Sequence, residues 1–207
     1  MAYCNLYYQK FTLSAFATDR TTSNKSYTLS TAEKAILKNR DNLVEELDKV
    51  AKAPIKETKE NLLPNGDFKK VEVRKIKATE NLSITNTRTY TTSSSTKTIT
   101  DEYGLDYAGI PNGGGSIVAV YKYNYVDIDS PNHMKTQIYS ASGHANDLDS
   151  NFYKLSYVDP NWDTTPEYQA SASVVFHMQM NGGIWYNVTI TNECEFNSYG
   201  EYSTSWS

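Results

Sequence analysis

The stretch over residues 170–196 reads ASASVVFHMQMNGGIWYNVTITNECEF, and it decides the fold class. Apolar side chains occupy the even positions on both sides of an Asn-Gly-Gly sequence, and mostly polar side chains stand between them. Alternation with a period of two residues is typical of β-strands that bury one face and leave the other in water. The stretch is therefore predicted to be a long β-hairpin whose even face forms the core.

The turn of this hairpin sets its register. A three-residue loop over residues 181–183 pairs Phe176 with Val188, so that the two even faces coincide. A two-residue loop would mix the buried and wet faces. Glycine also adopts the left-handed conformation that three-residue hairpin loops use. We therefore expect the three-residue loop.

This register gives two reactive side chains opposite surroundings. Cys194 falls on the even face opposite Ala170, where we expect a small buried hydrophobe rather than a nucleophile. His177 falls on the odd face across from Asn187, where we expect a surface histidine. The second cysteine, Cys4, lies near the N-terminus, and a disulfide between Cys4 and Cys194 is an open alternative.

Length and charge limit the class of protein. The 207 residues suffice for one or two domains with a substantial core. Charged residues make up 21% and the net charge is −4, so the chain lacks the basic footprint of a nucleic-acid-binding protein. It contains no run of about 18 apolar residues, so we expect no transmembrane segment. The 17 tyrosines suit half-exposed sheet faces, either as strand filler or as an aromatic ligand-binding face.

Residues 1–17 are expected to be a leader or the remnant of a signal peptide. They end in Ala15-Phe16-Ala17, a small-x-small pattern of the type that signal peptidase cuts, although no basic cluster precedes the short apolar run. Cleavage there would leave a chain that starts at Thr18. We therefore expect a secreted or extracellular protein.

Residues 18–64 are predicted to comprise a polar segment, one amphipathic helix and a linker. Ser30 and Glu33 form a capping-box pattern, and Pro54 ends the apolar repeat that follows. We expect the helix to lie on the sheet or to project from it as a spacer. Residues 55–64 are charged and poorly patterned, so they are expected to be the linker.

Residues 65–207 are predicted to form a β-domain, which makes the chain mainly β. Besides the hairpin, strand patterns occur at residues 71–84, 116–128, 134–140, 152–158 and 199–206. Gly, Pro, Asn and Asp turns separate these short strands, as in all-β proteins. Residues 116–128 begin apolar on both faces, which is typical of a central strand. We expect an antiparallel β-sandwich or a partly open barrel with one N-terminal amphipathic helix.

Residues 85–100 are almost wholly serine and threonine, and they are expected to form an exposed edge hairpin or a flexible loop. The segment resembles the Ser/Thr-rich hairpins with which aerolysin-type β-pore-forming toxins build a membrane barrel. That resemblance implies a membrane-active protein. A barrel strand needs an apolar lipid-facing side, however, and here only Tyr90 and Ile99 are large and apolar.

No catalytic residue is predicted. The three histidines lack zinc-ligand spacing, and no Gly-x-Ser-x-Gly elbow of a serine hydrolase is present. Asp147, Asp149 and Asn151 place oxygen ligands at alternate positions, as calcium loops do. Phe152 stands where such a loop needs glycine, and turn chemistry alone explains the cluster. We expect no cofactor, with Ca²⁺ at these three residues as the alternative.

The chain resembles small secreted β-rich proteins of Gram-positive bacteria that have no assigned function. The resemblance rests on the Ala-Phe-Ala leader end, on the charged helix over residues 30–53, and on the hairpin with its Gly-Gly-Ile-Trp-Tyr turn. It implies a secreted location and a β-rich fold, and it assigns no role to any residue.

The favoured function is a secreted non-enzymatic binding or cell-surface interaction module, because a tyrosine-rich β-scaffold is present and catalytic motifs are not. Its expected partner is a glycan or a cell-surface protein. The candidate ligand-binding residues are Trp162, His177, Gln179, Trp185, Tyr186 and Asn187. Two alternatives remain open. One is a β-pore-forming or membrane-active protein that uses residues 85–100, and the other is a secreted hydrolase whose site forms only in three dimensions.

The hairpin register makes a direct prediction about stability. Phe176→Asp places an unpaired charge in the predicted core, which is among the most destabilising changes known, so this variant is expected to be unfolded. Circular dichroism and a thermal melt measure the effect. A soluble variant with the wild-type melting temperature would refute the register.

Overall fold

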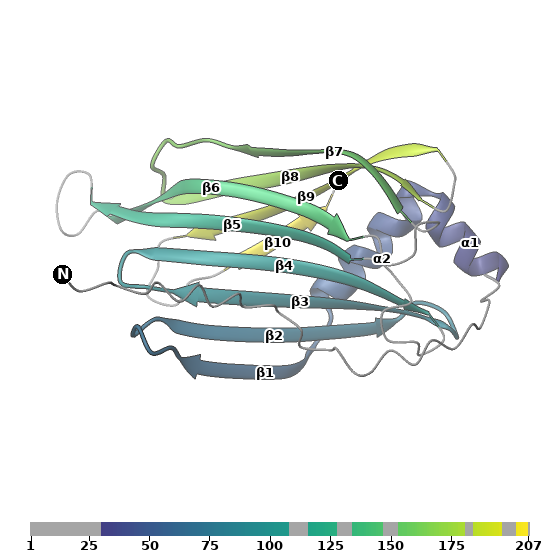
Figure 1. Cartoon of the computed structure of the whole chain (residues 1–207), viewed down its shortest axis with the longest axis horizontal. Helices are drawn as coiled ribbons and strands as arrows, with labels where there is room; N and C mark the ends of the chain where they lie inside the picture. The colour runs from purple at the N-terminus through teal and green to yellow at the C-terminus, as the bar shows by residue number, and fades with distance from the viewer. Residues whose placement is uncertain are drawn as a thin grey trace, which may run out of the picture.

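The computed structural model describes residues 30–107, 116–127, 134–146, 153–180, 184–195 and 202–206. Within them the chain is mainly β, as predicted, with two antiparallel sheets and two helices (Figure 1). Sheet A contains, in spatial order, β1 (Ile55–Leu62), β2 (Phe68–Lys77), β3 (Leu82–Thr92), β4 (Thr96–Tyr107), β5 (Ser116–Asp127) and β6 (Met134–Asn146). Sheet B contains β10 (Tyr202–Trp206), β9 (Trp185–Glu195), β8 (Gln169–Met180) and β7 (Tyr153–Trp162).

The two sheets pack face to face, with β6 against β8 and β5 against β9. The hydroxyl of Tyr121 on β5 donates to the carbonyl of Ile190 on β9, at 3.0 Å. β6 approaches β8 closely at Gly143, where an added Cβ would lie 2.5 Å from Cγ1 of Val174. Only glycine fits at this position without a shift of the facing sheet.

The β8–β9 hairpin has the predicted register. Ala170 pairs with Cys194, Phe176 pairs with Val188, and the even residues from Ala170 to Met178 and from Val188 to Cys194 are buried. Burial also raises the pKa of the Cys194 thiol, which agrees with the predicted structural role. Cys4 and the turn at residues 181–183 lie outside the described residues.

The other strand predictions are confirmed in position, with changed ends. β5 lies between β4 and β6, and the neighbours Ile117 and Val118 are both buried although they point to opposite faces, as expected for a central strand. β6, β7 and β10 contain or overlap the predicted segments. Residues 71–84 are divided between β2 and the start of β3.

The predicted single helix is wrong in one respect, because two helices occupy this segment: α1 (Thr31–Lys38) and α2 (Arg40–Lys52). The Ser30–Glu33 capping box is present. Asn39 has an extended backbone that ends α1, and its side-chain oxygen accepts a hydrogen bond from the Asp41 N–H at 2.9 Å, which caps α2. Neither described helix is long and apolar enough to cross a membrane.

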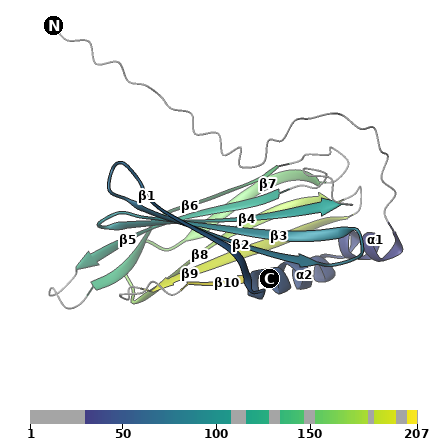
Figure 2. The same cartoon turned by 90° about the horizontal axis from the view of Figure 1, so that it is seen from below.

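α2 covers the inner side of sheet A beside β10. It packs against β2, β3, β9 and β10 (Figure 2). Its buried side chains are Leu43, Leu47 and Val50. α1 is anchored to the same layer through Glu33, whose carboxylate accepts a hydrogen bond from the Thr79 hydroxyl at 2.9 Å. The helices therefore belong to the packed core, and they do not project as a spacer.

The prediction of a linker at residues 55–64 is wrong, because most of this segment forms β1. All eight side chains of β1 are exposed, so the strand has no apolar face that could have marked it in the sequence. Its antiparallel pairing with β2 holds it in place. The connecting turn contains Gly66, whose φ of 87° lies in the left-handed region that favours glycine.

The prediction for residues 85–100 is also wrong, since they are neither an edge hairpin nor a flexible loop. They form most of β3 and the start of β4, which lie between β2 and β5. The threonines point to the outer face of sheet A, whereas Asn86, Arg88 and Tyr90 of β3 are buried on the inner face. The segment thus buries polar side chains, which a search for apolar alternation does not detect.

Arg88 of β3 forms a buried ion pair with Asp101 of β4. Arg88 donates to both carboxylate oxygens of Asp101, at 2.6 and 3.0 Å, and Asp101 is completely buried. The side-chain amide of Asn192 on β9 donates to the same carboxylate at 3.3 Å. Asn192 in turn accepts from the Tyr123 hydroxyl at 3.0 Å. The ion pair therefore connects sheet A to sheet B.

Removing one partner of this pair should be costly. Asp101→Ala is expected to lower the free energy of unfolding by about 3–5 kcal/mol, because it leaves a buried guanidinium without its counter-charge. Arg88→Met combined with Asp101→Leu removes both charges and should be closer to the wild type than either single variant. Urea denaturation of the single and double variants tests this. A double variant less stable than both single variants would contradict it.

Candidate functional site

The outer face of sheet B carries three stacked rings, which we name the aromatic ladder: Tyr157 on β7, His177 on β8 and Trp185 on β9. The Tyr157 and His177 ring centroids are 4.7 Å apart with 10° between the planes, and those of His177 and Trp185 are 5.1 Å apart with 3°. Tyr157 pairs directly with His177. Trp185 on β9 is the diagonal neighbour of His177. Tyr157 and Trp185 are 47% and 41% exposed, so the ladder keeps aromatic surface in contact with water.

Asn187 fixes the orientation of the central ring. Its side-chain oxygen lies 2.7 Å from Nδ1 of His177 and 3.5 Å from the Tyr157 hydroxyl. Since an amide oxygen only accepts hydrogen bonds, Nδ1 carries the hydrogen in neutral His177, and Nε2 is the acceptor. The carbonyl of Asn187 accepts from Nε of Arg40 at 3.0 Å, which ties this end of the face to α2.

The stacking determines which ring surfaces remain available. Tyr157 and Trp185 cover the two faces of His177, so only the ring edge of His177 can meet another molecule. Tyr157 and Trp185 each retain one face turned away from the stack. A ligand at the ladder would therefore contact outward ring faces at its sides and imidazole nitrogen at its centre.

A shallow hollow lies further along the same face, around Trp162 near the end of β7. Its lining residues are Asn161, Trp162, Asp163, Thr164, Ser171, Ala172, Ser173 and Thr191. Trp162 is 38% exposed. The N–H and the hydroxyl of Thr165 both donate to the Asp163 carboxylate, at 2.8 Å each, and these bonds lower the pKa of Asp163. The hollow thus combines serine and threonine hydroxyls with a carboxylate that stays ionised.

Short side chains connect the ladder to this hollow. One row of paired residues, Asp159, Val175 and Thr189, separates them, and the next row, Asn161, Ser173 and Thr191, already lines the hollow. His177 and Ser171 are six residues apart on β8, a distance of about 20 Å along an extended strand. We name the outer face of sheet B from the aromatic ladder to the Trp162 hollow the outer strip. It has the aromatic ladder at one end and mainly hydroxyl, amide and carboxylate groups along the rest of its length. Trp162 pairs with the buried Ala172, so its side chain belongs to the other face of β7.

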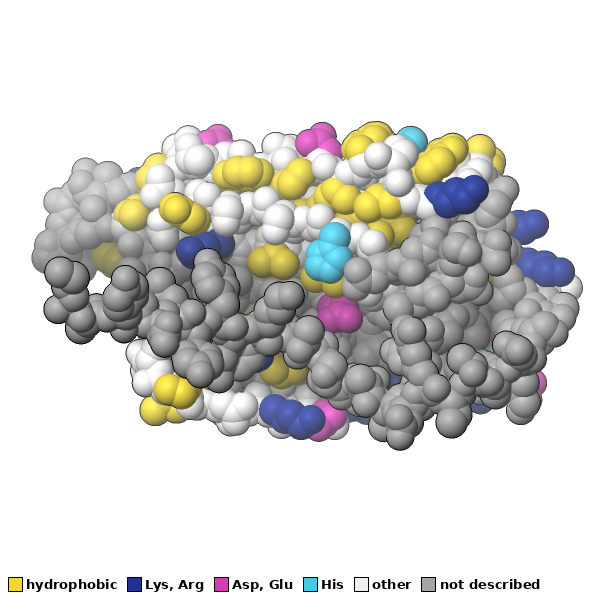
Figure 3. Space-filling view, in the orientation of Figure 1, with side chains coloured by type: hydrophobic (Ala, Val, Ile, Leu, Met, Phe, Trp, Pro, Cys, Tyr) yellow, Lys and Arg dark blue, Asp and Glu magenta, His cyan; other side chains and the backbone are white. Residues whose placement is uncertain are grey.

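Other exposed aromatic side chains differ from the ladder in their surroundings. Hydrophobic side chains also gather over the part of the molecule where β6 and β7 lie (Figure 3). The exposed Tyr139 and Tyr168 have Nζ of Lys122 and Lys135 over their rings, at 4.7 and 5.4 Å. Lysine therefore already occupies one face of each of these two tyrosines.

The structure brings three of the six predicted ligand-binding residues together. His177, Trp185 and Asn187 meet in the ladder and its hydrogen bonds, and Gln179 lies beside them, paired with Trp185. Trp162 borders the hollow at the opposite end of the outer strip, but its pairing with the buried Ala172 assigns its side chain to the other face of β7. Tyr186 lies on the other face of β9, where burial raises its pKa and its hydroxyl donates to the carbonyl of Lys38.

The metal candidates cannot be placed in the same way. Asp147, Asp149 and Asn151 lie outside the described residues. Among the residues that the structure describes, no group of three or more His, Cys, Asp and Glu side chains could hold a metal ion. Calcium at residues 147–151 therefore stays an untested alternative.

Sequence reasoning missed Tyr157, which completes the ladder. Its strand was predicted, but its partner was not, because the pairing of β7 with β8 is a matter of sheet order. The register between these strands also shifts between Leu155 and Tyr157, so alternation alone would not have aligned Tyr157 with His177.

Comparison with protein-family models, with curated proteins and with solved structures finds no significant match. The site must therefore be interpreted from its own geometry.

The Asn187 contact predicts the tautomer of His177. In the wild type, long-range ¹⁵N NMR at a pH where imidazole is neutral should show the hydrogen on Nδ1. Asn187→Ala removes the acceptor and should move the His177 population toward the Nε2–H form. His144, which lies on sheet A, serves as the internal control and should not change. Equal tautomer populations in both proteins would contradict the assigned hydrogen bond.

Proposed function

We propose that the protein is a secreted non-enzymatic binding module and that it binds an extended glycan along the outer strip. The observation that carries this proposal is the aromatic ladder, in which Tyr157 and Trp185 stay 47% and 41% exposed on a hydrogen-bonded platform. Exposed aromatic side chains combined with a few oriented polar groups are typical of ligand-binding surfaces.

The chemistry of the outer strip favours a carbohydrate. Sugar rings present C–H faces, which pack on the electron-rich faces of aromatic rings, and hydroxyl groups, which hydrogen-bond to hydroxyl, amide and carboxylate side chains. Trp185 stands at one end of the strip, and the Ser173 and Thr191 hydroxyls and the Asp163 carboxylate stand toward the other. A span of about 20 Å suits a chain of several sugars better than a single one.

The ladder is ordered before a ligand arrives. Stacking restricts the three rings, and Asn187 holds the central ring through a 2.7 Å hydrogen bond. Because side chains that are already ordered lose little conformational entropy on binding, preorganisation increases affinity. This supports recognition by a rigid face rather than by a loop that closes on its ligand.

The scaffold and the location are part of the same proposal. Two facing sheets with tyrosine hydroxyls bonded across them support a β-sandwich rather than a partly open barrel. The secreted location rests on the Ala15-Phe16-Ala17 pattern and on the stated resemblance, and an extracellular glycan is the kind of ligand such a protein would meet.

The alternative functions have less support from the described residues. In the β3–β4 hairpin the outer face is rich in threonine, and the apolar side chains of the inner face are interrupted by Asn86, Arg88 and Asp101, so neither face forms the continuous apolar band of a membrane barrel. For a hydrolase, His177 would need a positioned carboxylate or nucleophile, and its hydrogen-bond partner is the amide of Asn187.

A glycan array tests the proposal. The wild-type chain should bind at least one class of cell-wall or host polysaccharide, and Trp185→Ala should reduce that binding at least about tenfold, the equivalent of 1.4 kcal/mol. Tyr139→Ala is the matched control, because Tyr139 is an exposed aromatic side chain on sheet A. It should bind as the wild type does.

Tryptophan emission provides a second measurement. Bound polysaccharide should quench or shift the emission of Trp185 and Trp162, since both indoles are partly exposed. Absence of binding to every polysaccharide tested, or undiminished binding by a folded Trp185→Ala variant, would reject the glycan assignment.

A further inference from the structure

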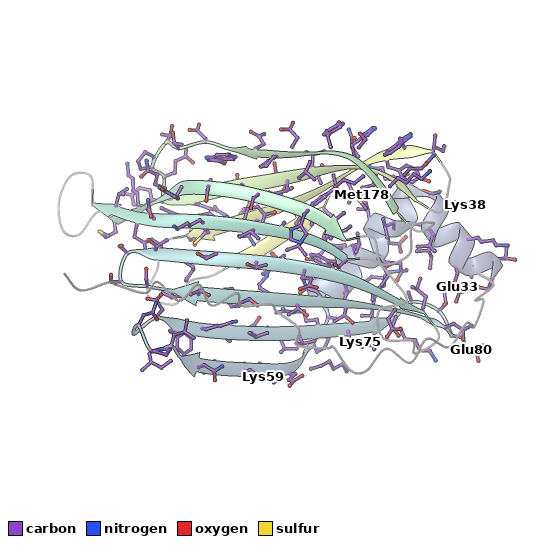
Figure 4. All side chains as sticks on the ribbon, viewed as in Figure 1. Glu33, Lys38, Lys59, Lys75, Glu80 and Met178 are labelled. Carbon is purple, nitrogen blue, oxygen red and sulfur yellow. The ribbon has the colours of Figure 1, made fainter. Side chains whose placement is uncertain are left out.

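β1 forms an open edge of sheet A. Only β2 pairs with it in the part of the chain that the structure describes, and all eight of its side chains are exposed. β1 lies along the lower border of the sheet in Figure 1, and Lys59 projects there in Figure 4. An open edge of this length presents a row of backbone donors and acceptors, which proteins normally cover or pair.

The hydrogen bonds to β2 determine which backbone groups of β1 face outward. Leu63 N–H donates to the Asp67 carbonyl at 2.8 Å, which makes Leu63–Asp67 a hydrogen-bonded pair at the turn. Hydrogen-bonded and non-hydrogen-bonded pairs alternate along an antiparallel ladder. From Leu62 back to Glu57 the register is unbroken, so the odd residues bond to β2. The even residues, with Thr58 at the centre, therefore direct their N–H and C=O groups to the open edge.

The charge order along this edge is self-complementary. The central residues read Lys56-Glu57-Thr58-Lys59-Glu60. If the strand meets a second copy of itself in antiparallel orientation with Thr58 opposite Thr58, every lysine lies opposite a glutamate. Opposite charges and Thr–Thr pairs are both favourable in directly opposed cross-strand positions.

We propose that two copies of this chain associate through β1, in an antiparallel pair centred on Thr58 that joins their two A sheets. The backbone and the side chains agree on this register. Thr58 must be a hydrogen-bonded pair across the two-fold axis, and it is one of the even residues whose N–H and C=O groups face outward. The interface uses the same strand on both copies, so association stops at the dimer and does not continue into a fibre.

Neighbouring registers are disfavoured by charge. A shift of one residue places lysine opposite lysine in one direction and glutamate opposite glutamate in the other. A shift that puts Glu57 or Lys59 on the two-fold axis opposes two like charges there. Like charges in directly opposed positions are destabilising, so the sequence selects the Thr58-centred register against its neighbours.

Existing ion pairs would extend across the interface. Within one chain, Nζ of Lys59 lies 2.8 Å from the Glu57 carboxylate, and Nζ of Lys70 on β2 lies 3.9 Å from Glu60. The second copy adds its Lys59 opposite Glu57 and its Lys56 opposite Glu60. Each glutamate of the edge would then lie between two cations.

The ends of the ladder would bury apolar surface. Leu62 is 75% exposed and Ile55 is 44% exposed in the single chain. In the proposed register Leu62 of each copy lies at the end of the ladder near Ile55 of the other copy, beyond the register shift between Ile55 and Glu57. The contact occurs twice, once at each end of the paired strands.

Charge reversal tests the proposal on the full chain by sedimentation velocity. The wild type should dimerise, and Lys59→Glu should raise the dissociation constant by about tenfold or more, because two opposite-charge pairs become two like-charge pairs. Glu57→Lys should do the same. The double variant Glu57→Lys/Lys59→Glu restores both pairs and should dimerise again. Lys154→Glu, an exposed reversal on β7, is the matched control and should dimerise as the wild type does.

A mixture of the two single variants gives the most discriminating test of the charge pairing. Glu57→Lys and Lys59→Glu should each be largely monomeric alone, yet an equimolar mixture should form a heterodimer because the two edges then complement each other. All these side chains are exposed, and circular dichroism checks that the variants fold as the wild type does.

A cross-link tests the symmetry. Cα atoms of a hydrogen-bonded antiparallel pair are about 5.5 Å apart, within the range of a disulfide, so Thr58→Cys should give an oxidised covalent dimer. Glu80→Cys, which is exposed and away from β1, should not. A wild-type chain that stays monomeric at the highest soluble concentration overturns the proposal, and so do single variants that dimerise as the wild type does.

Discussion

Arg88 and Asp101 form a buried ion pair at the centre of sheet A, in contact with the facing sheet. Ions taken out of water must find close partners, and here the guanidinium bonds to both carboxylate oxygens while Asn192 of the facing sheet bonds to the same carboxylate. Any other alignment of β3 and β4 would leave a buried charge without its partner, so the pair disfavours other registers of these two strands. The pair thereby fixes the centre of sheet A and its position over β9.

The register of sheet B has a functional consequence on its far side. The alternation that buries Phe176 and Val188 also forces His177 and Asn187 to the outer face, where Tyr157 and Trp185 close on them. The core and the outer strip are therefore the two opposite faces of the same strands. A one-residue slip would destroy both at once.

The sequence was sufficient where apolar periodicity and turn chemistry agreed, as in the β8–β9 hairpin and in the pairing of His177 with Asn187. It was insufficient where strands carry no apolar face. β1 alternates lysine and glutamate, and β3 buries Arg88, whose partners come from β4 and β9. The ladder was only partly predictable for the same reason, because Tyr157 reaches it through sheet order and a local register shift.

The two long sides of the molecule are closed to different degrees. At the β6 side, Thr136 and Glu167 exchange both backbone hydrogen bonds, at 2.7 and 2.9 Å, which links sheet A to the segment before β8. At the other side, among the described residues, β2 is the one strand that pairs with β1. In a single protomer, local opening should therefore begin at β1 and become steadily more costly toward β4. Sheet A would open first at β1 and last at β6, while the outer strip of sheet B stays folded.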